Sequence, residues 1–206
     1  MQKWLIGIDE AGRGPLAGPV AVGVLVVPHN FDWSLIPGVN DSKKLSEKKR
    51  EAIYTRTLEL VAEGKLSYIV EMPTAKAIDK QGIAVVIRAA IDKSLQTLSS
   101  RQDLDLRWGE CVVKLDGSLY APSYCVHQET IIKGDAKEKV IGLASIMAKV
   151  TRDRYMKKIA DRTAFQAYDF SRHKGYGTLA HRTAIAQNGL STLHRVSYCR
   201  NIKVVV

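Results

Sequence analysis

Acidic residues follow apolar runs at two separate places in this 206-residue chain. Asp9 and Glu10 stand directly behind an apolar segment that includes Trp4, and Asp116 stands directly behind residues 111–115. Acidic residues are depleted in strands and are rarely buried without a partner, so acids at the ends of core strands require a compensating cation or a wet cleft. A metal site is one arrangement that meets this requirement.

A further acid, Asp135, follows a lysine and a glycine. Carboxylates gathered around one cleft raise one another's pKa unless divalent cations neutralise them. Oxygen ligands favour Mg²⁺ or Mn²⁺ over zinc, and two such ions could hold an attacking water and a leaving oxygen on opposite sides of a phosphorus. Asp116 and Asp135 also have ordinary explanations, as a turn residue and a helix cap. Only the fold can bring the acids together.

Glu10 presents a geometric difficulty, because successive side chains of a regular strand point to opposite faces. It can share a site with Asp9 only if the strand ends or bulges there. Gly12 and Gly14 would permit such a break, since glycine adopts backbone conformations that other residues avoid.

The stretch Gly12, Arg13 and Gly14 suggests exposed backbone N–H groups and a guanidinium beside the acids. Such groups suit close contact with a sugar-phosphate chain. The same stretch fits a dinucleotide-binding pattern, but Pro15 and the strand-like run at 20–27 leave no helix N-terminus to receive a pyrophosphate. A tight turn with a solvated arginine remains the ordinary alternative.

The formal net charge of +10, from 31 Lys and Arg against 21 Asp and Glu, predicts attraction to polyanions such as nucleic acids. Lys43 and Lys44 are candidate phosphate contacts and are equally typical of a polar loop. Tyr176 lies between two glycines and is a candidate for stacking on a base or sugar, or for anchoring its loop.

The histidines offer a different nuclease chemistry, in which a pair acts as general base and acid on an RNA 2′-hydroxyl. None of the five has a recognisable motif around it. We expect most of them to be surface or structural residues, with His173 or His194 near the cleft.

The three cysteines are widely separated and include no Cys-x-x-Cys pair, so neither a disulfide framework nor a zinc ribbon is indicated. Gly7 and Asp9 interrupt the N-terminal apolar run, which lacks the apolar region of a signal peptide, and no segment is long enough to cross a bilayer. We therefore expect a cytoplasmic protein with no membrane partner.

The pattern of elements predicts an α/β fold with a mixed sheet, because strands and helices alternate after an initial hairpin. Both acid-bearing strands should be central. Expected strands cover residues 1–8, 20–27, 66–72, 111–115 and 123–128, and expected helices cover 47–63, 74–81, 83–98, 137–162 and 178–188, with Ser46, Thr74 and Thr178 as N-caps. The longest helix should carry a basic flank of Lys149, Arg152, Arg154, Lys157 and Lys158.

A hydrophobic fraction of 46% and the chain length are consistent with one domain and a real core. We expect a single catalytic domain over 1–206, in which residues from about 165 form a small C-terminal appendage.

The stretch from Gly7 to Val20 resembles the signature of ribonuclease HII, the type 2 ribonuclease H, of the bacterial kind. Further blocks resemble that family's pattern in the same order, at residues 41–45, 115–117, 133–135, 144–154 and 173–178. The resemblance implies a ribonuclease H-like fold, with a central mixed sheet flanked by helices and a helical C-terminal portion. It also implies Mg²⁺- or Mn²⁺-dependent cleavage of RNA in RNA–DNA duplexes, including a single ribonucleotide embedded in DNA.

The resemblance also assigns roles to individual residues. The metal-binding, catalytic carboxylates would be Asp9, Glu10, Asp116 and Asp135. The residues that read the 2′-hydroxyl at the RNA–DNA junction would be Gly12, Arg13 and Gly14. Tyr176 would pack on the adjoining deoxyribose, and Lys43 and Lys44 match the family's basic loop. Asp153 is expected to pair with a basic neighbour, and residues 194–198 resemble a His-Arg-x-Ser-Phe element with Tyr198 in place of Phe.

The hypothesis is in-line attack by a metal-activated water on the phosphodiester 5′ of a ribonucleotide, leaving 3′-hydroxyl and 5′-phosphate ends. Such a reaction would remove ribonucleotides from DNA in replication and repair. The alternative is a basic nucleic-acid-binding protein without catalysis. The tail at 201–206 shows no sliding-clamp-binding peptide, and a monomer is expected.

Overall fold

The computed structural model describes residues 2–39 and 44–202, so predictions for Asp41, Ser42, Lys43 and positions 203–206 lie outside the described residues. Within the described ranges, five strands form one mixed sheet in the order β3-β2-β1-β4-β5. The strands are β1 (Trp4–Ala11), β2 (Ala21–Pro28), β3 (Ser67–Glu71), β4 (Cys111–Asp116) and β5 (Gln128–Ile131). Both acid-bearing strands, β1 and β4, lie inside the sheet, which confirms the predicted placement.

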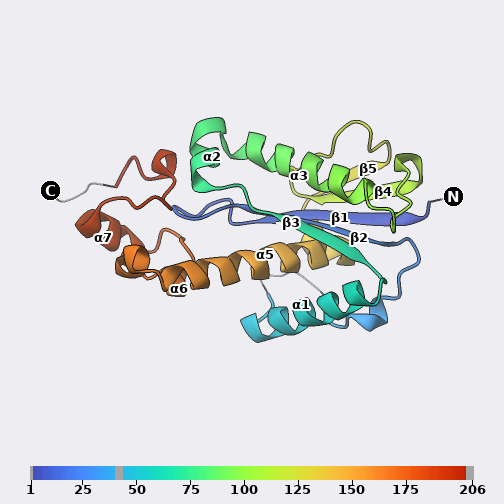
Figure 1. Ribbon diagram of the computed structural model, residues 1–206, viewed down its shortest axis with the longest axis horizontal. Helices are drawn as coiled ribbons and strands as arrows, with labels where there is room; N and C mark the ends of the chain where they lie inside the picture. Colours follow the sequence, from blue (N-terminus) through green and yellow to red (C-terminus); the bar gives the residue numbers. More distant parts are fainter. Residues whose placement is uncertain (1, 40–43, 203–206) are drawn as a thin grey trace.

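Helices cover both faces of this sheet (Figure 1). The helices are α1 (Glu47–Ala62), α2 (Ala75–Gln81), α3 (Ile83–Ser99), α4 (Gly134–Lys137), α5 (Lys139–Ala160), α6 (Phe170–His173) and α7 (Leu179–Asn188). Helices α2 and α3 lie on one face, α1 and α5 lie on the other, and α6 and α7 gather at the end of the molecule where the chain terminates. This arrangement matches the predicted α/β architecture with a helical C-terminal portion.

Three predicted N-caps begin their helices as expected. The hydroxyl of Ser46 accepts a hydrogen bond from the backbone N–H of Lys49, and Thr74 caps α2 through Ala77 in the same way. Thr178 caps α7 by the same contact. Each cap satisfies a backbone donor that a helix leaves unpaired in its first turn.

Strand β2 is apolar on both sides because the sheet is buried on both faces. Val22, Val24 and Val26 pack with the residues of α3, whereas Leu25 and Val27 pack with α1 and α5. The continuous β-branched run in the sequence therefore reflects two cores, one on each face of the sheet.

Two glycines let α5 approach the sheet closely. A Cβ built on Gly7 would lie 2.2 Å from the carbonyl oxygen of Val140, and one on Gly23 would lie 2.5 Å from that of Ala144. No other residue fits these positions without moving the helix. The close approach places Ser145 of α5 against the sheet beside Asp9.

Two predicted strands are wrong in their boundaries. The strand expected at 1–8 runs from Trp4 to Ala11, because its pairing with β2 continues past Asp9. Residues 123–127 form turns, and the strand begins only at Gln128, because buried Cys125 packs into the core from a loop. The helix predicted at 137–162 is α5, within two residues at each end, and the extended backbone of Glu138, with φ of −120°, separates it from the short helix α4.

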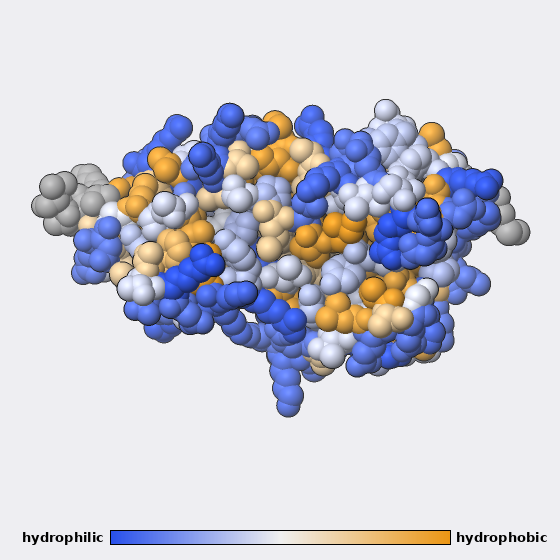
Figure 2. Space-filling model, in the orientation of Figure 1, coloured by the Kyte–Doolittle hydropathy of each residue, from blue (hydrophilic) through white to orange (hydrophobic). Residues whose placement is uncertain are grey.

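Hydrophilic residues dominate the outline of the molecule in Figure 2, and hydrophobic residues reach this surface in separate patches. None of the helices in the described ranges is long and apolar enough to cross a membrane.

Candidate active site

Strands β1 and β4 run parallel and bring their acids to the same edge of the sheet. Their last register pair is Ile8 with Leu115, so the next residues along the two strands are Asp9 and Asp116. Asp9 is only 4% exposed. Burial raises the pKa of Asp9 well above its ordinary value, and the charges of Glu10 and Asp116 raise it further, while a hydrogen bond with Ser145 acts in the opposite direction.

Glu10 does not lie at a strand end or bulge. Strand β1 continues in regular register with β2 as far as Ala11, and Glu10 lies opposite Val22. Alternation along the strand therefore places the side chains of Asp9 and Glu10 on opposite faces. The carboxylate of Glu10 turns to Arg13, with 3.2 Å between Oε1 and Nη1. Glu10 is the last residue but one of β1, and its charge still raises the pKa of Asp9, so the two carboxylates lie near each other at the end of the strand.

Asp116 and Asp135 are linked through a backbone contact. The Oδ1 atom of Asp116 accepts a hydrogen bond of 2.6 Å from the N–H of Gly134, the first residue of α4. Asp135, the next residue, is 5% exposed. The short helix α4 thus brings the fourth predicted acid next to the end of β4, although 19 positions separate the two in the chain (135 − 116).

The four acids supply carboxylate oxygens, which Mg²⁺ and Mn²⁺ prefer as ligands. Asp9 is buried, and the half-buried Glu10 and Asp116 repel its charge, which is an environment that a divalent cation stabilises. Over residues 2–39 and 44–202, however, no three His, Cys, Asp or Glu side chains converge closely enough to hold a metal ion. The donor set therefore fits a divalent cation in charge and ligand type without forming a finished coordination shell.

A fully buried arginine holds the glycine-rich turn that follows β1. The guanidinium of Arg195 donates to three carbonyl oxygens: Nη2 to Gly12 at 2.7 Å, Nη1 to Arg13 at 2.8 Å and Nε to Gly18 at 3.0 Å. Gly12 has a φ of +87°, a conformation that favours glycine. The turn is therefore organised from inside by Arg195, a role that residue spacing does not reveal.

A second buried guanidinium, that of Arg152 on α5, supports the same loop. Its Nε donates to the carbonyl of Pro19 at 2.8 Å, and its Nη2 donates to that of Ala17 at 3.1 Å. The prediction that Arg152 belongs to an exposed basic flank is wrong, because these carbonyls draw it inside. A Cβ on Gly12 would lie 2.1 Å from Nε of Arg152, so this glycine also makes room for the second arginine.

The loop that carries Tyr176 is attached to the glycine-rich segment. The carbonyl of Gly175 accepts hydrogen bonds from the N–H groups of Leu16 and Ala17, at 2.9 and 3.3 Å. Tyr176 is 41% exposed, and Arg152 lies 5.8 Å from the centre of its ring. The fold thus brings Tyr176 beside the glycine-rich segment and leaves part of the residue exposed to solvent.

The predicted basic surfaces are less uniform than expected. Lys44 is exposed just before α1, and Lys43 lies outside the described residues. On α5, Arg154 pairs with Glu51 at 2.5 Å, and Lys157 pairs with a second acid of α1. The expected pairing of Asp153 is confirmed, with Lys149 at 2.7 Å. Much of this flank is therefore neutralised by carboxylates.

Three histidines form a buried cluster away from solvent, and His29 and His127 are exposed. The Nε2 atoms of His181 and His194 lie 3.1 Å apart, and the ring of His173 stacks on that of His181. Burial lowers the pKa of His181 and of His194 to about 4. Buried neutral imidazoles cannot reach a substrate hydroxyl, so a histidine pair acting as general acid and base is not supported.

Sequence comparison assigns the chain to a known family. The sequence model of ribonuclease HII matches residues 6–201, a range that contains all four acids, the glycine-rich turn and Arg195. The chain belongs to the ribonuclease HII family. Ribonuclease HII enzymes are ribonuclease H hydrolases, so the alternative of a nucleic-acid-binding protein without catalysis is set aside.

Individual relatives agree with this assignment. The ribonuclease HII of Endomicrobium trichonymphae is 41% identical over 192 residues, which cover 93% of this chain and 83% of that protein. The crystal structure of ribonuclease H2 from Pyrococcus horikoshii OT3 has a TM-score of 0.70 and 25% identity, with 97% of each chain covered. Bst-RNase HIII in complex with Mn²⁺ shares the fold, with a TM-score of 0.69, 16% identity, and 95% of this chain and 67% of that one covered.

Proposed function

We propose that this chain is a metal-dependent endoribonuclease that cuts RNA in RNA–DNA hybrids and cuts 5′ of single ribonucleotides embedded in duplex DNA. Such an activity removes ribonucleotides from DNA during replication and repair. The observation that supports it best is the buried Asp9, which lies level with Asp116 and three residues before the turn that begins at Gly12. Acids for hydrolysis and groups for recognition thus lie within one short stretch of the chain.

Asp9, Glu10, Asp116 and Asp135 would hold the divalent cations, Mg²⁺ or Mn²⁺. When bound, such cations neutralise charge on a phosphate and promote the ionisation of water at neutral pH. One solved structure with the same fold, Bst-RNase HIII, is a complex with Mn²⁺. The buried carboxylate of Asp9, held by Ser145, would fix one ligand position before the substrate arrives.

Arg13 and Gly14 would recognise the ribose. Arg195 draws the carbonyl groups of Gly12 and Arg13 inward, whereas Gly14 is exposed and the Arg13 side chain is 42% exposed. A guanidinium donates hydrogen bonds, and a 2′-hydroxyl both donates and accepts them. Tyr176 would then pack its open face on the neighbouring deoxyribose.

In the proposed reaction, the oxygen of a water forms a bond to phosphorus while the bond from phosphorus to the upstream 3′-oxygen breaks. The leaving oxygen takes a proton and becomes a 3′-hydroxyl, and the ribonucleotide keeps a 5′-phosphate. The 2′-hydroxyl is recognised and does not attack, so no cyclic phosphate forms. These ends distinguish the reaction from a histidine-type ribonuclease, which leaves a 2′,3′-cyclic phosphate.

A duplex with one ribonucleotide tests the activity directly. We expect cutting on its 5′ side with Mg²⁺ or Mn²⁺, no cutting with a chelator, and no cutting of the matching all-DNA duplex, because the site needs both a cation and a 2′-hydroxyl. The products are read by mass spectrometry. Chelator-resistant cutting, or cyclic phosphate ends, would contradict the proposal.

Removing the Arg13 guanidinium should weaken selectivity more than chemistry. For Arg13→Ala we expect the ratio of kcat/KM on a single-ribonucleotide duplex to kcat/KM on a long RNA–DNA hybrid to fall about tenfold, the effect of roughly one lost hydrogen bond to a hydroxyl. Its ion pair with Glu10 is partly exposed, so little stability should be lost. Arg13→Lys keeps the charge and serves as the comparison. An unchanged ratio would mean that Arg13 does not read the ribonucleotide.

A further inference from the structure

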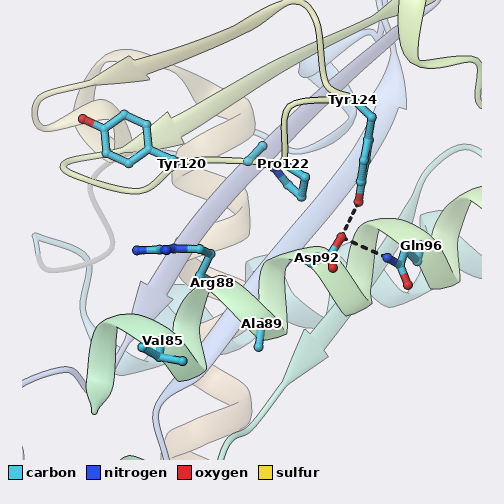
Figure 3. A pocket seen from close by; sticks show the side chains of 9 residues that line it. Val85, Arg88, Ala89, Asp92, Gln96, Tyr120, Pro122 and Tyr124 are labelled. Atoms are coloured by element: carbon cyan, nitrogen blue, oxygen red, sulfur yellow. Dashed lines mark hydrogen bonds between the residues drawn. The ribbon is translucent and has the colours of Figure 1, made fainter. Parts of the chain in front are cut away.

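A groove lies between α3 and the loop that joins β4 to β5, and its inner end reaches Arg13 of the glycine-rich turn. Its inner part is lined by Arg13, Arg88, Ser118 and Tyr120. Its outer part is a hollow of about 480 Å³, which shares Arg88 and Tyr120 with the inner part. Figure 3 shows the outer hollow, with Arg88 leaving α3 on the side of the loop that carries Tyr120.

Each wall of the groove has one residue that lies close to a predicted acid. Ser118 follows Asp116 by two residues on the loop side. On the other side, Arg13 is ion-paired with Glu10. A strand that passes the acids and leaves over Arg13 would therefore enter this groove next.

The two charged side chains of the outer hollow, Asp92 and Arg88, differ in whether they are already hydrogen-bonded within the protein. Asp92 is already occupied, because its Oδ1 accepts hydrogen bonds from the hydroxyl of Tyr124 at 2.7 Å and from the amide of Gln96 at 3.1 Å. Arg88 is exposed and forms no hydrogen bond or ion pair with any residue of the described ranges. The charge left open to a ligand in the outer hollow is therefore positive.

Tyr120 adds an aromatic surface beside this cation. It is 66% exposed, and its ring contacts no other aromatic ring or cation of the described residues. Large exposed aromatic rings are costly to leave in water and are common stacking platforms for bases and sugars. An arginine next to such a ring is the combination that holds a phosphate and its neighbouring nucleoside.

We infer that this groove binds the polynucleotide strand that flanks the cleavage point, with a phosphate on Arg88 and an adjoining sugar or base on Tyr120. The inference rests on the proposed function and extends it to one side of the cut. A nucleic acid fits better than a protein segment, because the unpaired charge in the middle of the groove, Arg88, is positive and the chain carries a net charge of +10.

Binding measured without cleavage tests this inference separately from catalysis. Fluorescence anisotropy in chelator would give Kd for a duplex with one ribonucleotide, for the same duplex shortened on one side, and for the duplex shortened on the other. We expect Arg88→Ala and Tyr120→Ala each to raise Kd about three- to tenfold on the long duplex. On the duplex that keeps the side bound by the groove, each variant should show the same rise in Kd. On the duplex shortened on that side, the Kd of each variant should equal that of the wild type.

Salt dependence separates the two residues and provides a control. Arg88→Ala should reduce the slope of log Kd against log salt by about 1, and Tyr120→Ala should leave the slope unchanged. The matched control is Arg107→Ala, which also removes one arginine charge. Arg107 is paired with Asp105 and lies just before the start of β4, at the end of that strand opposite to Asp116. This control should show no dependence on which side of the duplex is shortened.

Three results would decide against the groove. They are an unchanged Kd in both variants, equal losses on both shortened duplexes, and a loss of affinity for a protein partner with nucleic acid binding intact. Failure of the wild-type protein to cut with Mg²⁺ or Mn²⁺, while the one-sided loss in Arg88→Ala persists, would refute the proposed catalysis and leave the groove supported.

Discussion

The variant Asp9→Asn should lose cleavage, by about a thousandfold or more, while it folds at least as stably as the wild type. The loss is expected because an amide replaces a proposed cation ligand of a reaction that depends on charge neutralisation at the phosphate. Stability should hold because burial and the charges of Glu10 and Asp116 raise the pKa of Asp9. When the pKa of a carboxyl is higher in the folded state than in the unfolded state, the free energy of unfolding falls as the pH rises through the unfolded-state pKa toward the folded-state pKa. A neutral amide at the same position does not titrate and avoids this loss.

Two measurements on Asp9→Asn separate the site from the fold. Single-turnover cleavage of a single-ribonucleotide duplex gives the catalytic loss. The melting temperature with and without Mn²⁺ gives a readout that needs no activity, because a ligand of the folded state raises it. Asp153→Asn is the matched control, since Asp153 is also buried but pairs with Lys149 on α5. Undiminished cutting by Asp9→Asn, or a full Mn²⁺-induced shift, would overturn the assignment of this ligand.

The variant Arg195→Ala should damage both stability and recognition. It leaves the carbonyls of Gly12, Arg13 and Gly18 without their buried donor. Hydrogen bonds to charged groups are the stronger ones, and unpaired buried acceptors are costly, so we expect a loss of about 3–5 kcal/mol in the free energy of unfolding. Urea denaturation measures this loss directly.

The conservative variant Arg195→Lys distinguishes a recognition role from a purely structural one. Lysine keeps the charge but cannot direct a planar fork at three carbonyls, so the turn should remain folded and lose its defined shape. We expect a lower ratio of kcat/KM on a single-ribonucleotide duplex to that on a long hybrid, with kcat on the hybrid largely preserved. Arg200→Ala, an exposed charge loss five residues further on, is the control. An unchanged ratio in Arg195→Lys would show that Arg195 supports the fold alone.

Local signals predict much of the sheet and its first helices. The N-caps Ser46 and Thr74 begin α1 and α2 as expected, and the period of apolar residues defines α3. Acids behind two apolar strands predict a shared edge, and the parallel register of β1 and β4 places Asp9 level with Asp116. These features follow from the sequence because each depends on neighbours in the chain or on the repeat of a single element.

Features that depend on distant partners could not be predicted from spacing. A charged residue on an amphipathic helix indicates an exposed face, yet Arg152 turns inward to the carbonyl of Pro19, 133 positions away. Arg195 is 183 positions from its partner Gly12. The resemblance of residues 194–198 to a family element draws attention to Arg195, but it does not identify the carbonyl groups to which Arg195 donates hydrogen bonds. The alternation of β1, which separates Asp9 from Glu10, likewise depends on pairing with β2 beyond the expected strand end.

The contact between Arg195 and the turn after β1 has a consequence for the order in which the site is made during translation. The four acids and the strands that hold them lie within the first 135 positions, so they leave the ribosome well before Arg195 does. Until residue 195 emerges, the carbonyls of Gly12 and Arg13 have water as their partner. The nascent chain therefore acquires its acids first, and the turn that is proposed to select a ribonucleotide takes its final shape only after residue 195 has emerged.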